Sequence, residues 1–180
     1  MSLPNFFIAG AAKCGTTALY HCLREHPEVF LPHSKESYWL HKEPNYFCSD
    51  LGIADWLRYS DQDSYERIFD AAGEAKRIGD ATPWYLYSPE APARIAANCG
   101  KGSKVIIMLR PPVGWMRSFH HDMLRWGYED EGDFGKALDL CDARESGEQL
   151  PKRPAFAKCL NYRNAARFTE QVELYYKTFG

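Results

Sequence analysis

The sequence predicts an α/β fold with a P-loop-like, mostly parallel β-sheet flanked by helices. An apolar run at 6–9 leads through a loop of small residues into a helix-compatible run at 16–25. A later run at 104–109 is almost continuously apolar, as expected of a central parallel strand that is buried on both faces. Strand-like and helix-like stretches alternate along the chain, which favours a parallel sheet with helical connections.

The loop after the first predicted strand has the spacing Gly10-x-x-x-x-Gly15-Thr16-Thr17. A strand, a glycine-containing loop and a helix together direct backbone N–H groups and the positive end of a helix dipole at a phosphate. The usual P-loop has a lysine directly after the second glycine, whereas here Thr16 stands there and Lys13 lies inside the loop. An ordinary strand-turn-helix is the alternative, but the coincidence of lysine and threonines favours phosphate binding.

The end of the later strand indicates which kind of phosphate is bound. A P-loop that binds Mg-ATP needs a carboxylate at a strand end to hold the metal. Here the strand ends in Arg110, and Asp80 is the one candidate carboxylate near a strand end. The residues therefore favour a metal-free anion over a magnesium-bound triphosphate.

The remaining elements follow from periodicity and from residues that start or stop helices. Pro27 ends the first helix, Asp63 or Ser64 caps a later one, and Gly100 follows another. We expect strands at 6–9, 77–80 and 104–109, a short apolar extended piece at 29–31, loops at 45–51 and 146–154, and helices at 16–25, 53–59, 64–72, 88–99, 113–126, 134–143 and 156–179.

Composition limits the class of protein. The chain has 180 residues, 45% of them hydrophobic, and a formal net charge of −2, which predicts one domain (1–180) with no nucleic-acid or membrane partner. Its six cysteines include no C-x-x-C pair, so we expect no zinc or other metal site. No charged leader with an apolar core opens the chain, and no apolar run is long enough to span a bilayer, so we expect a cytoplasmic protein.

Taken together, the motifs resemble those of sulfotransferases that use 3′-phosphoadenosine-5′-phosphosulfate (PAPS), especially bacterial members and the heparan-sulfate-type glycan branch. The resemblance extends from about residue 6 to 118, and more weakly beyond. It is carried by Lys13-Cys14-Gly15-Thr16-Thr17-Ala18-Leu19, by Lys35-Glu36-Ser37-Tyr38-Trp39 and by the segment from Val105 to Ser118, with further similarity at Gly79-Asp80-Ala81-Thr82-Pro83.

The resemblance implies transfer of a sulfuryl group from PAPS to a hydroxyl or amine of a glycan or small-molecule acceptor, leaving PAP (3′-phosphoadenosine-5′-phosphate) as product. Glu36 would be the base, and Lys13 would stabilise charge on the leaving phosphate. Arg110 and Ser118 would bind the 3′-phosphate. The implied cofactor-binding set is Lys13, Cys14, Gly15, Thr16, Thr17, Arg110 and Ser118.

Several alternatives stay open at this stage. His33 and His41 flank Glu36 and are alternative bases, because imidazole titrates near neutral pH. A P-loop kinase or NTPase, or a nucleotide-binding module without turnover, are the alternative functions. Cys14 lies beside Lys13 and a helix start, so we expect a lowered thiol pKa.

The chain also departs from the pattern of the family it resembles. Arg110-Pro111-Pro112 lacks the acidic residue and the Glu-Arg pair that family members carry after the strand-end arginine. Members also continue beyond a helix such as 156–179. The resemblance therefore implies a domain that lacks the C-terminal strand and the cofactor-covering loop.

Overall fold

The computed structural model describes residues 3–154 and 156–180, which form an α/β fold around one parallel sheet. The sheet has the order β2-β3-β1-β4, with β1 (Phe6–Gly10), β2 (Val29–Phe30), β3 (Arg77–Asp80) and β4 (Lys104–Ile107). Each neighbouring pair is parallel. The predicted fold class is therefore confirmed, and the short piece near residue 29 is a strand at the edge of the sheet.

Strand β1 is central, and its side chains alternate between two apolar layers. Phe6 and Ile8 belong to a small cluster with Tyr20 of α1 (Thr16–Arg24). Phe7 and Ala9 belong to the larger cluster on the other face, which includes Ile95 of α4 (Ala91–Cys99). All five residues of β1 are buried, as expected of a central parallel strand with helices on both faces.

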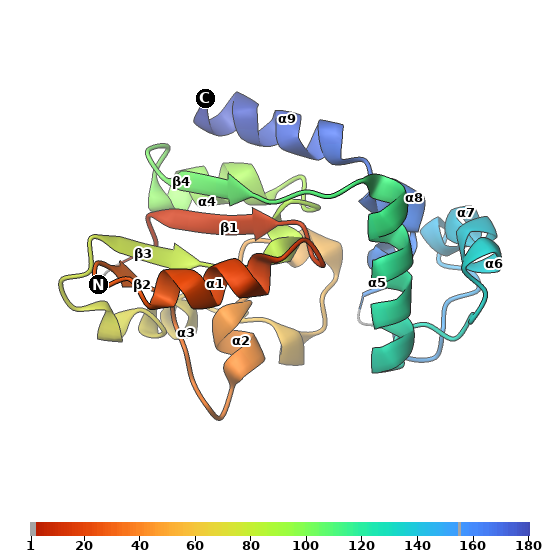
Figure 1. The fold of residues 1–180 in the computed structure, drawn as a ribbon, viewed down its shortest axis with the longest axis horizontal. Helices are drawn as coiled ribbons and strands as arrows, with labels where there is room; N and C mark the ends of the chain where they lie inside the picture. Colours follow the sequence, from red (N-terminus) through yellow and green to blue (C-terminus); the bar gives the residue numbers. More distant parts are fainter. Residues whose placement is uncertain (1–2, 155) are drawn as a thin grey trace.

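Figure 1 shows how the helices surround the sheet. Helix α1 and the short helix α2 (Tyr38–Lys42) lie on the face of the small cluster. Helices α3 (Gln62–Arg67), α4 and α9 (Phe168–Phe179) contribute Tyr65, Ile95 and Tyr175 to the larger cluster on the other face. Helix α5 (Pro112–Trp126) stands beside the ends of the strands, with α6 (Phe134–Asp139), α7 (Cys141–Glu145) and α8 (Tyr162–Ala165) beyond it. The loop that follows β1 points toward α5.

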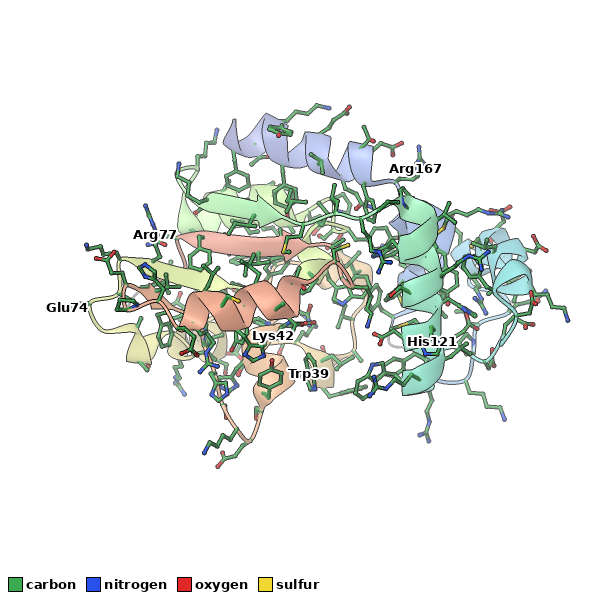
Figure 2. All side chains as sticks on the ribbon, viewed as in Figure 1. Trp39, Lys42, Glu74, Arg77, His121 and Arg167 are labelled. Atoms are coloured by element: carbon green, nitrogen blue, oxygen red, sulfur yellow. The ribbon has the colours of Figure 1, made fainter. Side chains whose placement is uncertain are left out.

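Helix α2 was not predicted, and a buried lysine helps to hold it. The Nζ atom of Lys42 lies 5.8 Å from the ring centroid of Tyr20 and 5.7 Å from that of Trp39, and its ammonium pairs with Glu43. Figure 2 shows Lys42 directed toward α1. A cation over aromatic rings, with its stem buried, joins α2 to the helix that follows the loop.

The predicted helix at 156–179 is wrong: it is three pieces, a 3₁₀ turn at Ala157–Leu160 followed by α8 and α9. The side chain of Asn161 accepts a hydrogen bond from the backbone N–H of Asn164 and so caps a new helix. Side chains of this kind compete with continuous helical hydrogen bonding.

Three other predicted helices are also shorter or broken. The predicted helix at 53–59 is only a 3₁₀ turn at Asp55–Leu57, and that at 134–143 divides into α6 and α7. Helix α3 ends earlier than predicted, and its cap is Asp61, whose carboxylate accepts from the N–H of Ser64 at 2.8 Å, rather than Asp63 or Ser64.

A carboxylate is buried at the end of β3. Asp80 is 1% exposed, and both of its oxygens accept hydroxyl hydrogen bonds, from Thr82 at 2.7 Å, Tyr85 at 2.7 Å and Tyr65 at 2.9 Å. Burial raises the pKa of Asp80 to about 6, although the hydroxyl donors act in the opposite direction. The folded protein therefore holds a proton on this carboxyl more tightly than the unfolded chain does.

The buried ion pair Glu129–Arg144 joins the end of α5 to α7. Both side chains are fully buried and the pairing is bidentate, with two N–O distances of 2.7 Å. The hydroxyl of Tyr162 in α8 donates to the same carboxylate at 2.7 Å, as do the backbone N–H groups of Asp130 and Glu131 at 2.9 Å. One carboxylate therefore connects the elements beyond α5.

We predict that the Asp80 carboxyl makes stability fall as pH rises from about 4 to about 6. A raised carboxyl pKa contributes stability that is fully present below the unfolded pKa of about 3.8 and is lost as pH passes the folded value of about 6. The free energy of unfolding of the wild type, relative to Asp80→Asn, should fall by about 2 kcal/mol across this range, out of about 3 kcal/mol for the complete titration. Denaturant unfolding at several pH values measures it.

Asp61→Asn serves as a control of opposite sign. The hydrogen bond from Ser64 lowers the pKa of Asp61, so its contribution is present above the unfolded pKa and is lost as pH falls through the folded value. A difference between wild type and Asp80→Asn that does not change with pH would contradict the assignment for Asp80.

We predict that Glu129→Gln lowers the free energy of unfolding by about 3–5 kcal/mol, because it leaves the Arg144 guanidinium charged and unpaired in the interior. The double variant Glu129→Gln/Arg144→Met should lose less, because no unpaired charge remains. The exposed pair Arg163–Asp139, at 3.7 Å, provides the control. Arg163→Met should change the free energy of unfolding by less than about 1 kcal/mol. Equal losses in the single and double Glu129 variants would show that the pairing itself is unimportant.

Candidate anion-binding site

The loop between β1 and α1 is packed closely against the carboxyl edge of the sheet. The Ala11 N–H donates to the Met108 carbonyl at 2.7 Å, and the Met108 N–H donates to the Gly10 carbonyl at 2.8 Å. A Cβ atom at Gly10 would lie 2.5 Å from the Leu86 Cβ and 2.9 Å from the Pro83 carbonyl oxygen. Only glycine fits there, so the first glycine of the motif serves close packing.

The second glycine starts α1 and leaves its N-terminus open. Gly15 has φ +89°, in the left-handed region, and as N-cap residue it has no side chain to bond the free N–H groups of the first turn. The first turn contains no acidic residue. Thr16 is 3% exposed and Thr17 is half-buried. The positive end of the helix dipole is thus uncompensated by its own helix.

Lys13 lies in the same loop and reaches across to α5. Its backbone is in the left-handed region, with φ 61°, which is uncommon for a non-glycine residue and is frequent at functional sites. Its Nζ atom donates to Oδ1 of Asp122 at 2.9 Å. Lys13 is therefore exposed at the junction between the loop and α5.

Arg110 is brought to the same place, although it is far away in sequence. Its Nη1 atom donates to the Lys13 carbonyl at 3.5 Å. Its Nη2 atom lies 3.6 Å from where a Cβ of Gly114 would stand, so the guanidinium passes over the first turn of α5. The side chain is exposed. Two cationic groups thus lie near the open N-terminus of α1.

Helix α5 is fixed to the loop by a tryptophan. The indole N–H of Trp115 donates to the Ala12 carbonyl at 2.6 Å, and the ring is stacked on Phe119 with an interplanar angle of 10°. Ser118 and Asp122 follow four residues apart, so they share one face of α5. Because Lys13 contacts Asp122, this face is turned to the loop, and Ser118 lies half-buried on it.

Cys14 differs from the sequence-based expectation. Burial raises the pKa of its thiol, and this outweighs the lowering effect of the Arg110 charge and of backbone N–H groups. The prediction of a lowered thiol pKa is therefore wrong, because the half-buried Cys14 packs against the larger apolar cluster.

Glu36, the predicted base, lies on an exposed turn just before α2. Its backbone N–H donates to the Ser34 hydroxyl at 3.2 Å. Within the described residues, no hydrogen bond or ion pair joins the Glu36 carboxylate to the loop or to α5. The structure therefore brings Lys13 and Arg110 together, but shows no direct contact between them and Glu36.

The two histidines near Glu36 have different surroundings. Desolvation, followed by the positive charges of Arg24, His21 and Lys35, lowers the pKa of His33. His41 is tied down, since its Nδ1 atom donates to the Ser37 carbonyl at 3.1 Å. The Tyr38 hydroxyl and His21 Nε2 lie 2.8 Å apart, which links the turn to α1. The lowered pKa favours the neutral form of the His33 imidazole, which can accept a proton.

Sequence reasoning missed two residues of this site. From the sequence alone, Trp115 is only one residue of the helix predicted at 113–126, and no motif includes Asp122. Asp122 was detectable in principle, because it follows Ser118 by four residues and is the one acidic residue in the sequence of α5.

In the described part of the chain, no three His, Cys, Asp or Glu side chains are grouped as metal ligands, and no helix has the length and apolar character needed to cross a membrane.

Comparison with known proteins finds sulfotransferases among the relatives, although no family model matches the sequence. The chain is 32% identical over 126 residues to the membrane-associated sulfotransferase kil1 of Dictyostelium discoideum. It is 36% identical over 113 residues to human heparan sulfate glucosamine 3-O-sulfotransferase 3B1. These matches cover 70% and 62% of this chain, and 24% of each relative. The matched part thus spans about a quarter of the length of these relatives.

A solved structure shows the same similarity over the whole chain. A sulfotransferase from Alicyclobacillus acidocaldarius superposes with a TM-score of 0.84 at 28% identity, covering 100% of this chain and 70% of that one. The fold of this chain is therefore that of part of a known sulfotransferase structure. Sequence relatives and structural neighbour agree, and the chain belongs to the sulfotransferase family.

Proposed function

We propose that this protein transfers a sulfuryl group from PAPS to a hydroxyl or amine of a glycan or small-molecule acceptor. The observation that carries the proposal is the convergence of Lys13, Arg110 and the open N-terminus of α1 at the carboxyl edge of the sheet. In open α/β sheets this edge is where ligands bind. The similarity to sulfotransferases supports a phosphosulfate as the anion.

The hydrogen-bond donors of the loop and of α5 suit a nucleotide with two separate anionic ends. The N–H groups of Gly15, Thr16 and Thr17, together with the threonine hydroxyls, would hold the 5′-phosphate. Arg110 and Ser118 would hold the 3′-phosphate, with the arginine fork on its oxygens and the serine as a neutral donor. Cys14 contributes backbone rather than thiol chemistry, because its thiol is half-buried and its pKa is raised.

Each residue then has a defined role in the transfer. Glu36 takes the proton from the acceptor hydroxyl as the acceptor oxygen forms a bond to sulfur. Lys13 stabilises the negative charge on the phosphate oxygen as its bond to sulfur breaks, and PAP leaves. Sulfuryl transfer of this kind depends on positioning and charge stabilisation, as phosphoryl transfer does.

The alternative of a magnesium-dependent kinase or NTPase has little support in the geometry. Asp80 was its candidate metal carboxylate, but both Asp80 oxygens are taken by hydroxyl donors and the residue is 1% exposed. Strand β4, the other neighbour of β1, leads instead to a cationic residue, Arg110. The binding site therefore supplies positive charge from protein side chains.

The names of the relatives favour a sugar hydroxyl as acceptor. The human relatives include heparan sulfate glucosamine 3-O-sulfotransferases and carbohydrate sulfotransferase 15, to which the chain is 57% identical over 37 residues. A glycan hydroxyl needs a base to remove its proton, which is the role proposed for Glu36.

We predict that PAP raises the melting temperature by about 5–10 °C at a hundredfold excess over its Kd, while Mg-ATP at the same concentration has little effect. A ligand that binds only the folded state stabilises it by mass action. Thermal unfolding of the full chain measures both. Stabilisation by Mg-ATP without stabilisation by PAP would contradict the proposal.

We predict that Glu36→Gln lowers the rate of sulfuryl transfer about 10²- to 10⁴-fold while leaving the Kd for PAP within about twofold, because a base acts on the acceptor and not on the nucleotide. Release of PAP from PAPS, with heparan sulfate oligosaccharides or 4-nitrophenol as acceptor, measures the rate.

Glu74→Gln is the matched control, since Glu74 is exposed just before β3 begins, at the opposite edge of the sheet (Figure 2). It should retain full activity. If Glu36→Gln is also fully active, Glu36 is not the base, and His33→Ala and His41→Ala become the variants that decide.

A further inference from the structure

The ion pair between Lys13 and Asp122 lies in the centre of the proposed site, and its function is not explained by the reaction. In the described part of the chain, the Lys13 ammonium makes one side-chain hydrogen bond, to Asp122 Oδ1 at 2.9 Å. The lysine proposed to contact the donor's 5′-phosphosulfate is therefore already paired with a carboxylate of the protein.

The pair is weak enough to be exchanged. The side chains of Lys13 and Asp122 are 34% and 20% exposed, and partly exposed pairs of this kind contribute little net stability because water competes for both charges. The phosphosulfate of the donor carries two negative charges, against one on the carboxylate, and several further hydrogen-bond donors would hold it at the same place. It can therefore displace Asp122 from the lysine.

Asp122 also lies on the face of α5 that would contact an anion bound in the proposed site. It shares a face of α5 with Ser118, one turn earlier, and Arg110 passes over Gly114 at the start of the same face. The first turn of α1 has no acidic residue, and α5 has Asp122 alone. This single carboxylate thus faces groups that otherwise attract anions.

We propose that Asp122 is a resident counter-ion of Lys13, which the 5′-phosphate of the donor must displace. This proposal rests on the proposed function and extends it. Asp122 acts through Lys13 and is a positioning residue: it holds the lysine in place at the loop before the donor binds, and it lowers the affinity for the nucleotide. It recaptures the lysine when the product departs, which favours release of PAP.

The test is the affinity for PAP measured by isothermal titration calorimetry on the full chain. Asp122→Asn should lower the Kd about three- to tenfold, because the lysine no longer has to leave a charged partner. Asp122→Glu, which keeps the carboxylate, should restore a Kd close to that of the wild type. Glu25→Gln makes the same change in net charge at the far end of α1, where Glu25 is exposed, and should alter the Kd less than twofold.

A double-mutant cycle separates competition for Lys13 from general repulsion. In a Lys13→Gln background, Asp122→Asn should change the Kd less than twofold, because the group that both anions compete for is absent. An undiminished effect in this background would overturn the proposal, since Asp122 would then act on the ligand directly. An unchanged or raised Kd in Asp122→Asn alone would also overturn it.

Inorganic pyrophosphate keeps this proposal separate from the proposed function. If PAP does not bind the wild type, the proposed function fails, but pyrophosphate still probes Lys13 without a nucleoside. Tighter pyrophosphate binding by Asp122→Asn than by the wild type supports the counter-ion role. Equal or absent binding by both proteins overturns it.

Discussion

The hydrogen bond from the Trp115 indole to the Ala12 carbonyl is the interaction on which the site depends. It fixes the first turns of α5 against the loop that follows β1. Trp115 is 1% exposed and packs on Phe119 and Phe168. The indole ring therefore cannot rotate away from Ala12 without opening the core. Everything else that α5 brings to the site, including Ser118 and Asp122, takes its position from this contact. A buried indole N–H needs a hydrogen-bond acceptor, and this need holds α5 in one position relative to the loop.

Two buried carboxylates organise their surroundings, one at the sheet and one in the region beyond α5. Asp80 gathers the hydroxyls of Thr82, Tyr65 and Tyr85 at the end of β3, close to the segment that packs on Gly10. Glu129 gathers Arg144 and Tyr162 behind α5. Both carboxylates are fully satisfied, so each specifies one arrangement of its neighbours. The loop and α5 lie between these two fixed regions, and the charged groups proposed to bind the donor are the exposed ones.

Much of this was predictable because its signals are local. The apolar runs gave the strands, and the glycine spacing with Lys13 gave the loop and its position at a helix start. The breaks near Asn161 and Arg167 were missed because Phe156, Leu160 and Phe168 keep an apolar spacing across them, and side-chain capping overrides such a pattern. The pKa of Cys14 is raised by burial in the folded chain, and the partner of Lys13 lies 109 residues away in the sequence, so no local pattern records either of them. The enzyme family followed from combining three separated motifs, none of which is decisive alone.

The order of the strands has a consequence for folding. Lys13 follows β1 and Arg110 follows β4, and the two are 97 residues apart although their strands are neighbours. Loop closure over such a distance is costly in entropy and is among the slower steps of folding. One of the two cationic side chains proposed to bind the anion therefore reaches the site only when β4 pairs with β1. A bound nucleotide would stabilise the completed sheet. A chain that has formed only β1, α1 and β3 lacks Arg110 at the site, so it would bind the nucleotide more weakly. Binding at the proposed site would therefore report on the pairing of β4 with β1 rather than on the formation of the loop alone.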